Sequence, residues 1–302
     1  MLKPTAFLTL LVVVMFSAAA SGQVQALRYT YVSPTGSDTN SCARSTPCRQ
    51  ITKALTVTQN GGTVTVLETG EYNNFTVTQS VSVVGDKGAQ AMIVSTNPNP
   101  NAGVYINDTA APYSSVTLRG LVIKENTNGI IANGQVGTVT VEDCTIEAVH
   151  YTIGAQAPGD YLVRNTHVRY GLYGMWFDSP NGEVRAVVEG SSFKNIGTQG
   201  LYAGNSAKVT VTNSLAEGNK DGFAAGLSAR LFLENCRSIG NADDGVTVSG
   251  SAWVRISNST IVNNQGYGVR SSGGYARTYG NNRLANNSLG STSGTFTLLD
   301  QQ

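Results

Sequence analysis

The residues whose types best suit chemistry are two aspartates one repeat apart, Asp221 in the string NKDG and Asp244 in ADDG. Two carboxylates held close together can act as a general acid with a nucleophile or base, because their like charges raise the pKa of one. The same strings are typical of turns, where Asp is favoured for backbone reasons. We therefore predict Asp221 and Asp244 as catalytic candidates, with a purely structural turn as the alternative.

A second group of candidates stands two residues beyond the glycines of the repeat, at positions expected to point outward. This column reads Trp176, Tyr202, Ala224, Thr247 and Arg270. Aromatic rings exposed on neighbouring strands form a flat apolar platform that suits the C–H face of a sugar ring. Packing of the rings against each other across strands, beneath a loop, is the alternative.

A third group lies on the first strand of each repeat, five residues before a recurring turn residue. That column reads Asp160, Arg185, Lys208, Arg230 and Trp253, with Ala276 expected next, and Phe232 and Arg255 share the neighbouring column. A basic stripe with aromatic rings suits an anionic polysaccharide, whereas an ordinary solvated strand face is the alternative. From both columns, substrate-binding roles are predicted for Trp176, Tyr202, Arg230, Phe232, Trp253, Arg255 and Arg270.

All these residues are positioned by a repeat that runs from Thr138 to Asn287. Its turn residues are spaced 22, 25, 23, 22, 23 and 23 apart, at Asp143, Asn165, Gly190, Asn213, Asn235, Asn258 and Asn281. The apolar residues before each turn alternate with period two, which indicates strands rather than helices. The pattern predicts an all-β parallel β-helix with about 22–23 residues per coil, in which equal offsets stack at roughly 4.8 Å.

Composition and the amino-terminal residues limit the fold type, the location and the partners expected for the chain. Of its 302 residues only 13% are charged and 34 are glycine, as tight coils require. Residues 1–22 carry Lys3, an apolar run and a small-residue tail, which predicts a secretory signal peptide and a secreted, periplasmic or cell-surface protein. Without Lys3 the chain has 19 basic and 19 acidic residues, so neither nucleic acid nor a membrane is expected as a partner. The oligomeric state stays open.

Four cysteines fall into two kinds. Cys42 and Cys48 flank ARSTP in a loop of an exported protein, so we predict a disulfide between them. Cys144 and Cys236 occupy one offset four repeats apart, which places them roughly 19 Å from each other by the strand spacing. That separation excludes a bridge, because a disulfide needs Cα atoms within about 7 Å. They are expected to be free structural thiols.

The chain is expected to have four parts. These are the signal peptide at 1–22, an amino-terminal segment at 23–62 with the disulfide loop and a short helix, the β-helix at 63–290, and a terminal strand or cap at 291–302. A solenoid exposes its core at the first coil and needs a cap there. The segment around Ile51 and Leu55 has the apolar face of a short cap helix.

Three strings resemble a known family: SPTGSDTNSCARSTPCRQITKAL, GGTVTVLETGEYNNFTVTQSVSVVGD, and VTLRGLVI with VEDCTI. They are similar to bacterial exported right-handed parallel β-helix proteins of the pectin-lyase-like superfamily. The resemblance covers essentially the whole chain after the leader and implies a right-handed coil with three sheets. It leaves the activity open, because the superfamily includes polysaccharide lyases, glycoside hydrolases, epimerases and members of unknown role.

The catalytic motifs of that superfamily are largely missing. Polygalacturonase-like hydrolases use N-T-D, D-D, H-G and R-I-K, and only Asp243-Asp244 matches one of them. The sequence shows no compact group of three or four acids with an arginine on neighbouring coils, as calcium-dependent pectate lyases have, so neither a metal nor another cofactor is expected. We predict an exported protein that contacts a polysaccharide, for which the basic stripe suggests an anionic one. The alternative is a lyase or hydrolase of an acidic polysaccharide.

Overall fold

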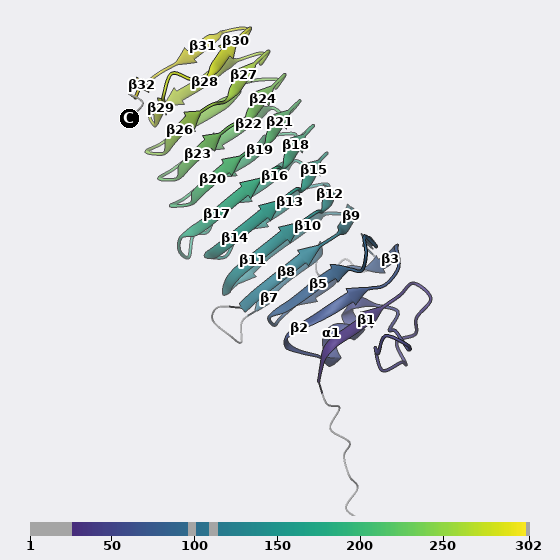
Figure 1. Cartoon of the computed structure of the whole chain (residues 1–302). Helices are drawn as coiled ribbons and strands as arrows, with labels where there is room; N and C mark the ends of the chain where they lie inside the picture. The colour runs from purple at the N-terminus through teal and green to yellow at the C-terminus, as the bar shows by residue number, and fades with distance from the viewer. Residues whose placement is uncertain (1–25, 96–100, 109–113, 300–302) are drawn as a thin grey trace, which may run out of the picture.

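The computed structural model describes residues 26–95, 101–108 and 114–299, and these form an elongated stack of coils (Figure 1). Each regular coil contributes one strand to each of three parallel sheets, so the sheets run the length of the molecule. This confirms the predicted all-β solenoid. The predicted signal peptide lies outside the described residues.

Within the described residues the first sheet has 12 strands, in order β1 (Leu27–Val32), β2 (Thr58–Val66), β5 (Val81–Gly85), β8 (Ser114–Arg119), β11 (Val136–Glu142), β14 (Gly159–Arg164), β17 (Val184–Glu189), β20 (Lys208–Thr212), β23 (Arg230–Glu234), β26 (Trp253–Ser257), β29 (Tyr275–Thr278) and β32 (Phe296–Leu298). The second sheet has 10, in order β3 (Gly70–Asn73), β6 (Ala91–Val94), β9 (Leu121–Asn126), β12 (Thr145–Ala148), β15 (His167–Arg169), β18 (Ser192–Lys194), β21 (Leu215–Glu217), β24 (Arg237–Ile239), β27 (Thr260–Val262) and β30 (Arg283–Ala285).

The third sheet also has 10 strands, in order β4 (Phe75–Val77), β7 (Ala102–Asp108), β10 (Asn128–Gly134), β13 (Tyr151–Ala155), β16 (Tyr173–Phe177), β19 (Gln199–Ala203), β22 (Asp221–Ala225), β25 (Val246–Ser249), β28 (Tyr267–Ser272) and β31 (Gly290–Ser293). All pairings between strands are parallel, so residues at equal offsets lie side by side on successive coils.

The turn from the first sheet to the second explains the recurring Asn, Asp or Gly. Asp143, Asn165 and Asn213 have φ values of 53°, 47° and 52°, in the left-handed region that these residue types tolerate. The final turn departs from the predicted register. There Gly280 takes the left-handed conformation with φ 77°, and not Asn281. As a result Tyr275 pairs with Trp253, whereas Ala276, which we expected there, points into the core.

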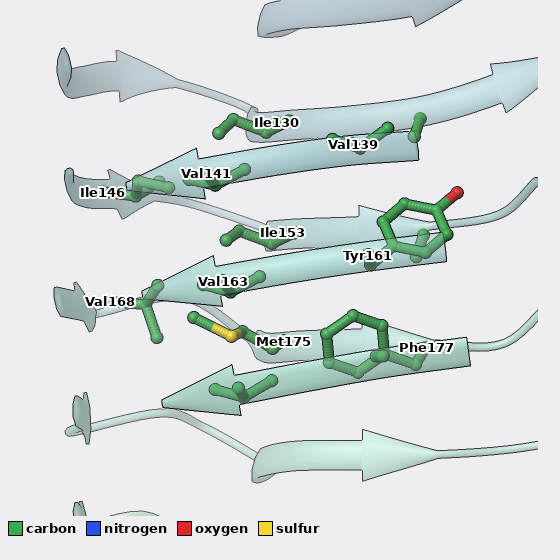
Figure 2. Close-up of a cluster of buried hydrophobic side chains, with 14 of the residues drawn as sticks. Ile130, Val139, Val141, Ile146, Ile153, Tyr161, Val163, Val168, Met175 and Phe177 are labelled. Carbon is green, nitrogen blue, oxygen red and sulfur yellow. The ribbon is translucent and has the colours of Figure 1, made fainter. Parts of the chain in front are cut away.

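The core is a stack of apolar side chains enclosed by the three sheets. Figure 2 shows Val141 and Val163 on neighbouring first-sheet strands, close to Ile146 and Ile153 of the other two sheets. All four are at most 3% exposed. The alternation read from the sequence is therefore the alternation between core and surface.

Asparagines at one turn join coil to coil inside the stack. The backbone N–H of Asn219 donates to Asn241 Oδ1 at 3.0 Å, and the N–H of Asn241 donates to Asn264 Oδ1 at 3.0 Å. The three residues are at most 1% exposed. Because buried N–H groups need acceptors, this ladder holds the turn that precedes the third sheet.

At the amino-terminal end, α1 (Ile51–Val57) packs against the first strands, as the predicted cap requires. The disulfide between Cys42 and Cys48 is present, with Cα atoms 4.6 Å apart. Cys144 and Cys236 are free and buried, and burial raises the pKa of Cys144 to about 12 and that of Cys236 to about 11. No helix in the described ranges is long and apolar enough to cross a membrane.

Candidate functional site

The structure divides the predicted site residues between two outward surfaces. We call the first the aspartate face; it lies on the third sheet and comprises Tyr151, Tyr173, Trp176, Gln199, Tyr202, Asp221, Asp243, Asp244 and Arg270. We call the second the arginine face; it lies on the first sheet and comprises Arg230, Phe232, Trp253, Arg255, Tyr275 and Arg277. The two columns in which the sequence predicts substrate binding therefore lie on two different sheets.

On the aspartate face, Asp221 and Asp244 come together as their equal offsets imply. Asp221 opens β22, and Asp244 stands at the matching position of the next coil, where its backbone O accepts from the N–H of Gly222 at 3.0 Å. The N–H of Asp244 in turn donates to Asp221 Oδ1 at 3.1 Å. One carboxylate thus serves as an acceptor for the backbone of the other.

Both carboxyl groups are buried. Asp244 is 0% exposed and Asp221 is 4% exposed. The N–H of Tyr267 donates to Asp244 Oδ1 at 2.7 Å, and Gln199 Nε2 donates to Asp221 Oδ2 at 3.2 Å. Burial raises the pKa of Asp244 above its ordinary value, and the Tyr267 N–H and the Arg270 charge oppose that rise. The two aspartates therefore stabilise the turn by accepting hydrogen bonds from backbone N–H groups.

Asp243 completes a group that the sequence analysis missed. One oxygen each from Asp221, Asp243 and Asp244 lie within 4.8 Å of one another. Arg270, one coil further on, forms an ion pair with Asp244 and lies 3.9 Å from Asp243. The expectation that no compact acidic group faces an arginine was wrong. The turn points the side chains of two consecutive aspartates toward one place, and Arg270 extends back across its neighbouring coil to reach them.

This group sets what the face can hold and do. Carboxylate oxygens are the ligands that Ca²⁺ prefers, so Asp221, Asp243 and Asp244 are candidate ligands for such a cation. In the structure the guanidinium of Arg270 supplies the counter-charge. The side chain of Asp243 is 37% exposed, so Asp243 and Arg270 are the members of the group that solvent reaches.

Aromatic rings adjoin this group on the amino-terminal side. Trp176 and Tyr202 pair across β16 and β19 with ring centroids 4.0 Å apart and an angle of 26° between the ring planes. They are half-buried and stack on each other, and do not form the flat platform expected from the sequence. Tyr151 and Tyr173 stack in the same way at 4.9 Å, and Tyr173 meets Trp176 edge to face.

The rings and the aspartates belong to one continuous column. Tyr151, Tyr173, Gln199 and Asp221 occupy the same offset on four successive coils, because β13, β16, β19 and β22 pair in register. Phenol, amide and carboxylate groups therefore follow one another along the axis of the third sheet. At its amino-terminal end the column opens into a groove of about 340 Å³ lined by residues that include His150 and Tyr151.

On the arginine face, the aromatic rings support guanidinium groups. Trp253 pairs with Arg230 and Tyr275, while Arg255 pairs with Phe232 and Arg277. The Cζ atom of Arg277 lies 4.2 Å from the Trp253 ring centroid, and that of Arg255 lies 5.1 Å from the Phe232 ring centroid. These are cation–π distances.

The predicted basic stripe is neutralised on the preceding coils of the same sheet. Arg185 forms an ion pair with Asp160 at 2.6 Å, and Lys208 forms one with Glu183 at 2.6 Å. The bond from Arg185 lowers the pKa of Asp160, and the bond from Lys208 lowers that of Glu183. Half of the stripe is therefore a ladder of surface ion pairs.

Comparison with known proteins agrees with this architecture. A family model described as "Right handed beta helix region" matches residues 156–300. The chain is a right-handed parallel β-helix protein. A search of curated proteins finds no match.

Two solved structures share the fold of this β-helix protein. The crystal structure of pectate lyase Pel9A has a TM-score of 0.67 at 16% identity, over 92% of this chain and 79% of that one. The complex structure of XylC with xylose has a TM-score of 0.56 at 10% identity, over 86% of this chain and 69% of that one. At these identities the likeness concerns the fold alone.

Several site residues of this β-helix protein were not predicted. Tyr151 and Tyr173 share an offset, so the period could have found them, but they lie three residues before the column of Trp176. Tyr275 and Arg277 were not assigned a role because the turn was predicted at Asn281, one residue after its actual position at Gly280. For the orientation of the Asp243 side chain the sequence offers no signal.

Proposed function

We propose that this β-helix protein binds a polysaccharide along the aspartate face, with the sugar chain running parallel to the coil axis. The observation that carries this proposal is the continuous column from Tyr151 to Asp221 on four coils of one sheet. The phenol and amide groups of the column and the exposed carboxylate of Asp243 suit hydrogen bonds to sugar hydroxyls, and the Trp176 and Tyr202 rings offer apolar contact beside them. The fold supports it, since Pel9A is named a pectate lyase and XylC was solved with xylose.

The charge of the face restricts which part of a sugar it accepts. Three carboxylates and one guanidinium lie together, so the group carries excess negative charge when all are ionised. Like charges repel in a poorly solvated site. Hydroxyl groups, which donate to carboxylates, therefore suit this place, and an acidic substituent would need a bound cation beside it.

A second candidate function, cleavage of the bound chain, is favoured by the pKa of Asp244. A buried carboxyl whose pKa is raised can remain protonated and act as an acid, while a nearby ionised carboxylate acts as a base or nucleophile. Asp221 and Asp244 have oxygens within 4.8 Å, and Arg270 stands at the solvent side to contact substrate. In this interpretation Asp221 and Asp244 are the acid/base pair, as the sequence analysis predicted.

The proposal is tested by incubating the purified protein with neutral and uronate polysaccharides, with Ca²⁺ or with a chelator. Co-sedimentation reports binding, ultraviolet absorbance reports elimination, and reducing ends report hydrolysis. We expect Trp176→Ala to weaken binding roughly two- to tenfold, as loss of one aromatic contact implies. The matched control is Tyr29→Ala, an exposed tyrosine on the first coil, which should bind as the wild type does.

Two results would contradict these interpretations separately. If no polysaccharide in the panel binds to the wild-type protein, the binding function is wrong. If cleavage is seen and survives in the Asp221→Asn, Asp244→Asn double variant, the catalytic assignment is wrong while the binding function stands.

A further inference from the structure

We infer that the arginine face is a second glycan-binding site, which takes the carboxylate groups of a uronate polysaccharide. The inference rests on the proposed function in taking a polysaccharide as the partner. It uses different residues, on a different sheet, from those of the aspartate face. The two sites can therefore be tested one at a time.

The site is a shallow groove built by three consecutive coils. It has a volume of about 240 Å³, and Arg230, Phe232, Trp253, Arg255 and Arg277 line it. These residues come from β23, β26 and β29, which are neighbours in the first sheet. Each strand carries one arginine; Arg255 pairs with Arg277, whereas Arg230 lies in the neighbouring column. The backbones of Arg255 and Arg277 are therefore one strand spacing of about 4.8 Å apart along the axis on which a polymer would lie.

The three arginines of the groove have no anionic partner in the described part of the chain. Arg230, Arg255 and Arg277 form neither an ion pair nor a side-chain hydrogen bond there, whereas Arg185 and Lys208 on the preceding coils are paired with acids. The ring of Phe232 packs against the guanidinium group of Arg255, and the ring of Trp253 packs against that of Arg277. The N–H edges of these guanidinium groups stay free, and a guanidinium edge matches a carboxylate in a bidentate pair.

The aromatic side chains of the arginine face are exposed to water. Phe232 is 39% exposed, Trp253 is 40% exposed and Tyr275 is 44% exposed. Apolar groups collected on one surface of a soluble protein mark interaction sites. The sugar ring that carries a uronate group has an apolar C–H face, so rings and guanidinium groups together suit it.

A polyanionic glycan fits this groove better than a nucleic acid does. Trp253 and Tyr275 are tilted by 38° at 5.0 Å, and Arg277 covers one face of Trp253, so these rings leave no parallel slot for a base. An acidic group on the aspartate face would need a bound cation beside it, whereas the arginine face supplies cations of its own.

The test measures binding of polygalacturonate, a uronate homopolymer, to the full chain by co-sedimentation and titration calorimetry. We expect the Arg255→Gln, Arg277→Gln double variant to lose at least about tenfold in affinity. The matched control is Arg185→Gln, Lys208→Gln, which removes paired cations from the same sheet and should change affinity by less than about twofold. Added salt should weaken binding to the wild type more than to the double variant.

The outcomes separate this inference from the proposed function. Unchanged polygalacturonate affinity in the Arg255→Gln, Arg277→Gln variant overturns the second site, and so does tighter binding of a single-stranded oligonucleotide than of polygalacturonate. If Trp176→Ala weakens binding of neutral glycans roughly two- to tenfold but leaves the affinity for polygalacturonate unchanged, both sites stand. Circular dichroism of each variant confirms that the coil is folded.

Discussion

The aspartate face and the arginine face lie on different sheets of the same coils, yet they hold their charges in opposite ways. Asp221 and Asp244 are buried and accept bonds from the backbone of the next coil. Arg255 and Arg277 lie in the middle of strands and rest on aromatic rings at the surface. The presence of a charged side chain that bonds to the backbone at a turn is explained largely by the stability of the coil. The presence of an unpaired charged side chain in mid-strand is not explained in this way.

This difference affects how each face can be tested. Substitutions on the aspartate face alter the turn as well as the surface, so a loss of binding there has two explanations. Substitutions of Arg255 or Arg277 on the arginine face remove only contacts with exposed aromatic rings among the described residues, so a loss of binding there reports mainly on the ligand. The predictions that follow test this contrast, from the largest expected effect to the smallest.

The largest effect is expected for Asn241→Ala, behind the aspartate face. This change removes the acceptor for the Asn219 N–H at 3.0 Å and the donor to Ser238 Oγ at 2.9 Å, all in buried positions. Leaving buried polar groups unpaired should cost about 2–3 kcal/mol of the free energy of unfolding. Urea denaturation followed by circular dichroism measures it, and a cost below about 0.5 kcal/mol would contradict the structural role of this turn.

A moderate effect with a distinct pH dependence is expected for Asp244→Asn. Because the folded-state pKa of Asp244 is raised above its ordinary value of 3.8, the protonated carboxyl favours the folded protein. Its contribution to stability is therefore full at low pH and is lost as the pH rises through the raised pKa. The free energy of unfolding of the wild type minus that of Asp244→Asn should fall over this window. A difference independent of pH would show that burial does not govern this carboxyl.

The smallest effect on stability is expected on the arginine face. Arg255→Ala or Arg277→Ala removes one cation–π contact at an exposed site, so the free energy of unfolding should change by no more than about 0.5–1 kcal/mol. The same urea denaturation measures it beside Asn241→Ala. A cost equal to that of Asn241→Ala would mean that these arginines support the coil, and the contrast between the two faces would be lost.

The fold was predictable because short-range sequence patterns determine the geometry of the coil. Alternation of apolar residues marks strands, and a left-handed turn residue such as Asn165 or Asn213 recurs once per coil. Equal spacing then predicted the neighbours that the structure contains, Trp176 beside Tyr202 and Phe232 beside Arg255. The sequence could not distinguish Gly280 from the adjacent Asn281 as the turn residue, since both types tolerate positive φ.

The candidate site was less predictable because it depends on side-chain direction. The period placed Asp221 beside Asp244, but whether Asp243 points to the same place depends on turn dihedrals that spacing does not determine. Arg270 reaches Asp244 through a long side chain whose rotamer is chosen by the ion pair. The burial of the aspartates likewise depends on the packing of the neighbouring coils, which the spacing in the sequence does not determine.

The chain contains two tryptophans, Trp176 on the aspartate face and Trp253 on the arginine face, so each face has its own fluorescent reporter. Single-tryptophan proteins are made by Trp253→Phe and Trp176→Phe, and each is titrated with a neutral polysaccharide and with polygalacturonate. We predict that the emission of Trp176 changes saturably with at least one of the two polysaccharides. The emission of Trp253 should change saturably with polygalacturonate and not with the neutral polysaccharide. Glycan binding that leaves the emission of both tryptophans unchanged would contradict the account.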